Sequence, residues 1–190
     1  AWLSSDRGVE RLAAASRVME NFYSVRLIDQ ASRTAAKVVD TLRNYIYTGE
    51  EGVVERLSAS EEVELVLTQF QGRIREGLEV VRDYDPRAVL EGDRKRLSVV
   101  WNALIKNALD SMENRGVLGV RTSGDGGRIR VEISDTGPGI DPAIRDRVFE
   151  PFVTTKTGGA GMGLGLDIAR KIVQDYGGTI EFESAPGSTV

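Results

Sequence analysis

The stretch RIRVEISDTGPGI (residues 128–140) ends a predicted strand on a carboxylate and follows it with two glycines. Apolar and polar residues alternate up to Asp135, which predicts a half-buried β-strand. Gly137 and Gly139 then leave room for a flat ring against the backbone. An ionised Asp135 could accept a hydrogen bond from an exocyclic amino group, and we expect such a pairing to favour adenine over guanine. A tight turn after the strand explains the same residues, because Asp, Gly and Pro all favour turns.

A second glycine-rich stretch, EPFVTTKTGGAGMGLGLDIA (residues 150–169), runs directly into a predicted helix. Unpaired N–H groups and the positive end of the helix dipole meet at such a junction, which suits phosphate groups. The stretch lacks the GK[ST] ending of a P-loop, and Leu166 replaces the last glycine of GxGxxG. A flexible linker is the alternative, but linkers rarely carry Leu164, Leu166 and Ile168 immediately behind the glycines.

A third stretch, NALIKNALDSM (residues 102–112), places Asn107 in an otherwise apolar helical turn. Asparagine is a poor residue for a helix interior, because its side chain competes for backbone hydrogen bonds. Its amide oxygen could serve as a ligand for Mg²⁺ that is shared with nucleotide phosphates. A buried amide with satisfied hydrogen bonds explains the residue equally well.

Residues 58–190 have the pattern of a compact α/β domain. Helices and an antiparallel-rich sheet predict a two-layer α/β sandwich. The expected elements are a helix over 61–75, strands over 78–84 and 88–91, a long helix with Asp93 as its N-cap, a hairpin over 116–135, a short helix after Pro142, a helix over 165–176 closed by Gly177 and Gly178, and a strand over 179–185.

Residues 1–50 have a different pattern, and we expect them to form a separate helical segment. Residues 11–47 contain neither proline nor glycine, and apolar or small residues recur there at heptad spacing. The pattern predicts a long amphipathic helix, about 20–47, that packs against a partner; a helix packed on its own domain is the alternative. The seam consists of Ile28, Ala31, Ala35, Val38, Leu42 and Tyr45.

The composition excludes several classes of protein. The 190 residues contain no cysteine, which excludes disulfides and thiolate metal sites. A net charge of −4 without a basic stripe argues against nucleic-acid binding. The apolar runs are too short for a membrane span and no signal peptide is present, so we expect a soluble, cytoplasmic chain. The missing initial methionine suggests a larger parent, which would reach a membrane only through its missing N-terminal part. The chain also contains no histidine.

Four motifs in this order resemble those of sensor histidine kinases. NALIKNALDSM is similar to the Asn box, DTGPGI (residues 135–140) to the first glycine box, FEPFVTTK (149–156) to the phenylalanine box and GMGLGL (161–166) to the second glycine box. These kinases share the Bergerat ATP-binding fold with DNA gyrase, mismatch-repair and heat-shock chaperone ATPases. The resemblance covers residues 60–190 and favours the nitrogen-regulator type. Residues 27–46 are more loosely similar to the second helix of the dimerisation and phosphoacceptor hairpin.

The resemblance implies a role for individual residues. Asn107 would hold Mg²⁺ against the phosphates, Asp135 would bind the adenine amino group, and Lys156 would lie near the γ-phosphate. The other implied positions are Gly137, Gly139 and Ile140 in the base pocket, Gly161, Gly163, Leu164 and Gly165 around the triphosphate, Phe149 and Phe152 as anchors of the lid, and Thr189, in GST, as the residue that assists Asp135.

The sequence departs from the family pattern at two places. The Asn box usually has another polar residue four positions before its magnesium ligand, and that place is Ala103 here, with Asn102 beside it. Because this position can supply a base for hydrolysis in related ATPases, Ala103 puts hydrolysis in question. The phosphoacceptor histidine of the family is also missing.

The sequence therefore predicts the ATP-binding catalytic domain of a sensor histidine kinase with part of its dimerisation bundle. With Mg²⁺ and ATP, the parent protein would phosphorylate a histidine outside this chain and relay the group to a response regulator receiver domain. The N-terminal helix would form a homodimer. One alternative is a degenerate kinase that senses ATP or binds partners without catalysis. Another is an anti-sigma-type serine kinase on the same fold, against which the long heptad helix argues.

Overall fold

A computed structural model describes residues 19, 22–26, 28–29, 31–32, 35, 52–156, 161–185 and 188–190. The chain divides into two compact units, Ala1–Ile46 and Tyr47–Val190. The described residues of the first unit are helical and exposed, and they include Ile28, Ala31 and Ala35 of the predicted seam. Val38, Leu42 and Tyr45 lie outside the described residues, so the pairing of this helix with a partner stays a prediction.

The second unit contains all the strands that the structure describes. In chain order its elements are β1 (Glu55–Ser58), α2 (Ala59–Gln69), α3 (Gln71–Ile74), β2 (Leu78–Tyr84), β3 (Val89–Gly92), α4 (Arg94–Ser111), β4 (Gly116–Asp125), β5 (Arg128–Asp135), the 3₁₀ helix η2 (Arg145–Arg147), α5 (Gly165–Asp175), β6 (Ser184–Ala185) and β7 (Ser188–Thr189).

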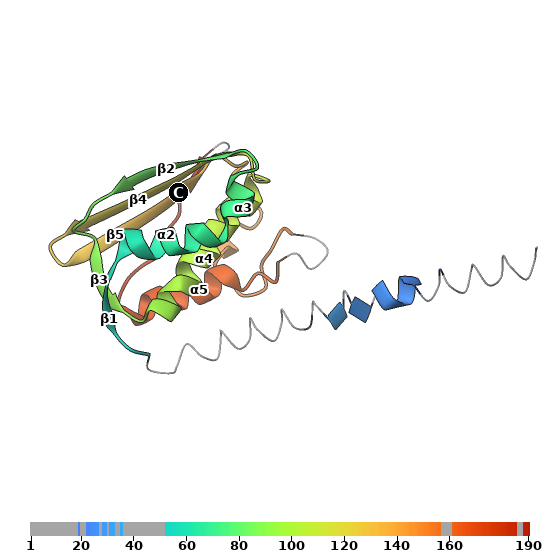
Figure 1. The fold of residues 1–190 in the computed structure, drawn as a ribbon, viewed down its shortest axis with the longest axis horizontal. Helices are drawn as coiled ribbons and strands as arrows, with labels where there is room; N and C mark the ends of the chain where they lie inside the picture. The colour runs from blue at the N-terminus through green and yellow to red at the C-terminus, as the bar shows by residue number, and fades with distance from the viewer. Residues whose placement is uncertain are drawn as a thin grey trace, which may run out of the picture. The chain divides into compact units, whose positions relative to one another are not determined.

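A five-stranded sheet forms one layer of this unit, with the order β2-β4-β5-β7-β6. β2 runs parallel to β4, and every other neighbouring pair is antiparallel. Helices α2, α4 and α5 lie together on one side of the sheet, as Figure 1 shows. β1 and β3 form a separate antiparallel pair. This arrangement confirms the predicted two-layer α/β sandwich.

The core lies between the helices and one face of the sheet. Ile105 and Leu109 of α4 are fully buried, as are Leu118 and Val120 of β4. Because side chains alternate along a strand, the intervening positions point to the other face, where Arg121 pairs with Asp83 at 2.7 Å. Among the described residues, no helix is long and apolar enough to cross a membrane.

Local sequence signals account for several element boundaries. The carboxylate of Asp93 accepts hydrogen bonds from the backbone N–H groups of Lys95 (2.7 Å) and Arg96 (3.4 Å), so the predicted N-cap of α4 is confirmed. The β4–β5 hairpin turns at Gly126 and Gly127, whose φ angles of +56° and +84° favour glycine.

Three predicted elements differ from the structure. The helix expected over 61–75 is divided into α2 and α3 at Phe70, which leaves the helical backbone with ψ of 8° and donates its N–H to Leu67. The short helix after Pro142 is the 3₁₀ helix η2. The strand expected over 179–185 begins only at Ser184; Ile180 packs on the core outside any strand of the described sheet.

Candidate nucleotide-binding site

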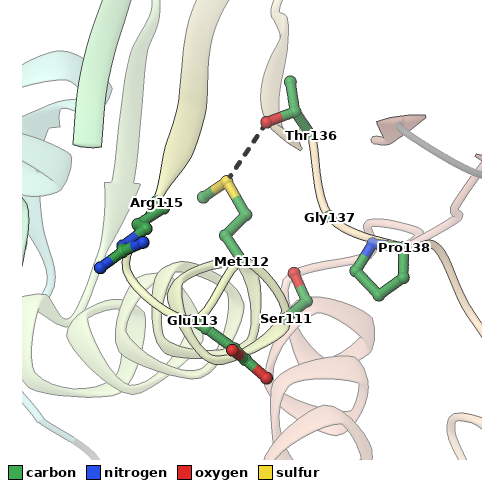
Figure 2. A pocket seen from close by; sticks show the side chains of 7 residues that line it. All are labelled: Ser111, Met112, Glu113, Arg115, Thr136, Gly137 and Pro138. Atoms are coloured by element: carbon green, nitrogen blue, oxygen red, sulfur yellow. Dashed lines mark hydrogen bonds between the residues drawn. The ribbon is translucent and has the colours of Figure 1, made fainter. Parts of the chain in front are cut away.

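A hollow of about 430 Å³ lies where the end of α4 meets the loop that follows β5. In Figure 2 the side chains of Thr136 and Met112 point toward each other across the hollow. The Thr136 hydroxyl lies 3.7 Å from the Met112 sulfur. Thr136 also accepts a hydrogen bond from the N–H of Val117 at 3.0 Å, which fixes the start of the loop. The lining residues are Ser111, Met112, Glu113, Arg115, Thr136, Gly137 and Pro138.

Asp135 stands at the edge of this hollow as the last residue of β5 and is 8% exposed. Its Oδ1 atom accepts hydrogen bonds from the Ser111 hydroxyl at 3.0 Å and from the N–H of Gly137 at 2.8 Å. Within the described part of the chain, no group donates a hydrogen bond to its other oxygen, Oδ2. Oδ2 is not one of the fully buried side-chain atoms without a partner among the described residues, so it can be reached from solvent. A ligand that shields Oδ2 from water has to bring a donor, because a carboxylate oxygen buried without one is costly.

The two glycines after Asp135 are required by close contacts. A Cβ atom on Gly137 would lie 2.6 Å from both Asp135 Oδ1 and the Ser111 hydroxyl oxygen. Gly139 has a φ of +84°, and a Cβ there would lie 2.9 Å from the carbonyl oxygen of Ala185. The next residue, Ile140, donates its N–H to the Ser184 hydroxyl at 2.8 Å, so the loop is held against β6.

Thr189 lies beside Asp135 in the sheet, as judged from the backbone pairing of their strands. β7 pairs with β5 in a register that places Thr189 opposite Asp135. The side chain of Thr189 lies outside the described residues, so its expected assistance to Asp135 stays a prediction.

The second glycine stretch packs against two neighbouring segments. Gly163 has a φ of +66°, and a Cβ there would lie 2.5 Å from the carbonyl oxygen of Val153. Its own carbonyl accepts the N–H of Phe152 at 3.0 Å. Gly165 begins α5 and approaches α4, because a Cβ on Gly165 would lie 3.6 Å from that of Ala103. Leu164, between them, is buried, whereas Gly158 and Gly159 lie outside the described residues.

The two phenylalanines of the phenylalanine box have different surroundings. The ring of Phe149 lies 5.9 Å from that of Phe182, and the guanidinium of Arg170 lies 5.4 Å from its centre. Phe152 is 71% exposed and has a φ of +67°. Phe149 therefore packs within the domain, whereas Phe152 is available to contact something outside it.

Asn107 lies on α4 one turn before Ser111 and is half-buried. No described residue forms a hydrogen bond with its side-chain amide, so its oxygen is free to accept a ligand. The structure describes no group of three or more acidic residues that could hold a metal ion by themselves. Asn107 therefore fits a Mg²⁺ ion whose remaining ligands are phosphate oxygens and water.

Lys156 forms an ion pair with Asp110, which is not among the predicted site residues. The Lys156 ammonium donates to Asp110 Oδ2 at 2.6 Å, and the Lys106 ammonium donates to the same oxygen at 2.7 Å. Arg73 pairs with Asp110 Oδ1 at 2.9 Å. Burial raises the pKa of the Asp110 carboxyl, but the hydrogen bonds from Lys106 and Lys156 outweigh it and lower the pKa to about 2. The i, i+4 spacing of Lys106 and Asp110 was the available sequence signal.

The fold and the matched sequence define the class of protein. Residues 92–190 match the family described as histidine kinase-, DNA gyrase B- and HSP90-like ATPases, so the chain belongs to this ATPase family. Within it, the similar proteins are sensor histidine kinases, as the four motifs predicted. The chain is 34% identical over 179 residues to the sensory histidine kinase/phosphatase NtrB of Escherichia coli O157:H7, a match that covers 88% of this chain and 50% of NtrB.

A second curated relative and two solved structures agree with this assignment. The C4-dicarboxylate transport sensor protein DctB of Rhizobium meliloti is 34% identical over 166 residues, which cover 85% of this chain and 26% of DctB. The chain thus spans half or less of the length of these two relatives. The catalytic domain of histidine kinase ThkA matches with a TM-score of 0.65 and 28% identity over 72% of this chain and 91% of that domain. Full-length ShkA in complex with AMPPNP matches with a TM-score of 0.69 and 27% identity over 80% of this chain and 33% of ShkA.

Proposed function

We propose that this chain is the ATP-binding catalytic portion of a two-component sensor histidine kinase, which transfers the γ-phosphoryl group of ATP to a histidine. The observation that carries the proposal is the buried Asp135 carboxylate, which has one oxygen held by Ser111 and Gly137 and the other without a donor among the residues that the structure describes. An adenine amino group supplies the missing donor. The match to a solved kinase that holds AMPPNP supports ATP as the nucleotide.

Different residues of the site bind different parts of the nucleotide in this proposal. Asp135 selects the base, and Gly137 and Gly139 allow the ring to approach the backbone. Mg²⁺, when bound, neutralises phosphate charge, and Asn107 is the residue that would hold it. Lys156 and the N-terminus of α5 supply positive charge for the phosphates. Phosphoryl transfer depends mainly on positioning and charge stabilisation, which these groups provide without a covalent step of their own.

The partners follow from the family rather than from a contact in the structure. The acceptor histidine must come from outside these residues, because the chain contains none. The N-terminal helix, about 20–47, forms a homodimer in this proposal, and the phosphoryl group passes from histidine to an aspartate of a receiver domain. A cytoplasmic location suits this reaction.

One observation favours a second function, that of a degenerate kinase that senses ATP or binds partners without catalysis. Ala103, where the family usually has a polar residue, lies against Gly165 in the structure. Ala103 cannot activate water, since it has no proton acceptor. This second function and the first share the same nucleotide site and differ in phosphoryl transfer.

Radiolabelled ATP separates the two functions. The chain by itself should bind Mg-ATP and gain no label. A longer form of the protein that includes a histidine-bearing helix should gain label that is stable in base and lost in acid, as phosphohistidine is. If the longer form contains the histidine, binds ATP and still takes up no label, the degenerate kinase is the correct function.

A further inference from the structure

Asp110 gathers three cations from different parts of the domain. Arg73 reaches it from α3, Lys106 from the preceding turn of α4, and Lys156 from the segment before the glycine stretch. The Asp110 side chain is 19% exposed, so these pairs are partly shielded from water. Three cations on one carboxylate leave an excess of positive charge, which favours an anion nearby.

The two lysines are close neighbours because they share one oxygen. Lys106 and Lys156 both donate to Asp110 Oδ2, at 2.7 and 2.6 Å. Two ammonium groups at this separation repel each other, and the carboxylate between them offsets the repulsion. Without the charge of Asp110, the two flexible side chains would move apart into solvent.

Lys106 and Lys156 lie next to the proposed nucleotide site. Asp110 is three residues after Asn107 on α4, so the two side chains are neighbours on the helix surface. The stem of Lys156 lies against the second glycine stretch, since a Cβ on Gly161 would lie 3.1 Å from Lys156 Cδ. The pair therefore lies between the residue suited to Mg²⁺ and the loop suited to phosphates.

We infer that Asp110 is a positioning residue that holds Lys106 and Lys156 together as a paired cation for the terminal phosphate of the nucleotide. Lys106 thereby becomes a second phosphate-binding lysine beside Lys156. The inference rests on the proposed function, because it takes the ligand to be ATP. It also implies that the pair distinguishes ATP from ADP, which lacks the terminal phosphate.

The test compares the affinities of Mg-ATP and Mg-ADP by calorimetric titration of the whole chain. Lys106→Gln and Lys156→Gln should each weaken ATP binding about tenfold and leave ADP binding nearly unchanged, since each removes a hydrogen bond between charged groups. Lys95→Gln removes the same charge from the exposed first turn of α4 and should change neither affinity.

Asp110→Asn gives the decisive result, because the two explanations predict opposite signs. If Asp110 acted only through its own charge, its removal would relieve Coulomb repulsion toward the triphosphate and strengthen ATP binding. If Asp110 positions the lysines, Asp110→Asn should instead weaken ATP binding about tenfold, with ADP binding retained. Stronger or unchanged ATP binding by a folded Asp110→Asn chain overturns the inference.

Two further outcomes keep the test decisive. If Asp110→Asn does not fold, as judged by circular dichroism, the Lys106→Gln/Lys156→Gln double variant replaces it: a loss confined to ATP supports the paired cation, and unchanged ATP binding overturns it. If the unmodified chain binds both nucleotides and neither lysine variant loses affinity for ATP relative to ADP, the inference fails and the proposed function stands. If the unmodified chain binds neither nucleotide, the proposed function fails as well.

Discussion

The hydroxyl of Ser111, the last residue of α4, donates a hydrogen bond of 3.0 Å to Oδ1 of Asp135, the last residue of β5. The same hydroxyl lies 2.8 Å from the carbonyl oxygen of Ala108, one helical turn earlier. The end of the helix thus sets the orientation of the carboxylate at the end of the strand. Because Oδ1 is occupied in this way, Oδ2 is the oxygen left for a ligand.

Ser111→Ala should weaken ATP binding without unfolding the domain. The change removes a hydrogen bond to a charged acceptor, worth about 1.5–3 kcal/mol, so we expect a loss of roughly tenfold or more in affinity. Calorimetric titration measures the affinity, and thermal denaturation measures the fold. An unchanged affinity would show that Gly137 alone is sufficient to orient Asp135.

Asp135→Asn should reduce or reverse the preference for ATP over GTP. The amide oxygen can keep the hydrogen bonds from Ser111 and Gly137, which places its NH₂ group at the position of Oδ2. That donor opposes the amino group of adenine and suits the carbonyl oxygen of guanine. Glu132→Gln, on the opposite face of the same strand, is the matched control and should keep the native preference. Competition between the two nucleotides for one fluorescent analogue checks the prediction.

Asn107→Ala should abolish the effect of Mg²⁺ on ATP binding. Alanine is favourable in a helix, so the fold should remain intact, but the neutral oxygen ligand is lost. Titration with ATP in Mg²⁺ and in a chelator should give different affinities for the native chain and equal ones for the variant. Asn102→Ala removes an amide from the same helix, where it contacts Gln69 at 3.3 Å, and should keep the difference.

Gly137→Ala should damage the site, whereas Gly72→Ala should not. The new methyl group at Gly137 meets Asp135 Oδ1 and the Ser111 hydroxyl at 2.6 Å, so we expect a cost of about 1–3 kcal/mol in unfolding free energy and weaker ATP binding. Gly72 lies in α3, where an added methyl group would have no atom within 4 Å, and alanine there should stabilise the domain by about 0.4–1 kcal/mol. Urea denaturation of both variants tests the contrast; equal stability would contradict it.

Asp110 should make the unfolding free energy of the domain depend on pH in the acid range. Burial raises its pKa, but the lysine hydrogen bonds outweigh burial, so the pKa falls from the ordinary value of 3.8 to about 2 in the folded domain. A lowered pKa stabilises the fold above the unfolded value, and this stabilisation is lost as the pH falls through about 4 toward 2. Because solvent partly screens these pairs, Asp110→Asn should lower the unfolding free energy by on the order of 1 kcal/mol at neutral pH and by little near pH 2. The same difference at both pH values would contradict this assignment.

Local signals in the sequence were enough to predict most of the elements. The N-cap at Asp93, the hairpin glycines Gly126 and Gly127, and the alternation that ends at Asp135 each depend on a few adjacent residues. Adjacent residues fix these features because caps, turns and strand faces are set by backbone conformation within one or two turns. The final strand was predicted too long, because alternation shows which residues can face a core but not which find a partner strand.

The sequence by itself determined the family and the order of the motifs, and it predicts which residues bind the base and the metal, because those residues lie in short, recognisable patterns. Only the tertiary structure decided which side chains support them. Ser111 meets Asp135 from 24 residues away, and Lys156 meets Asp110 from 46 residues away. Such pairs depend on how α4 packs against β5 and on where the chain returns to the helix, and packing between distant elements is set by the whole core rather than by any local stretch.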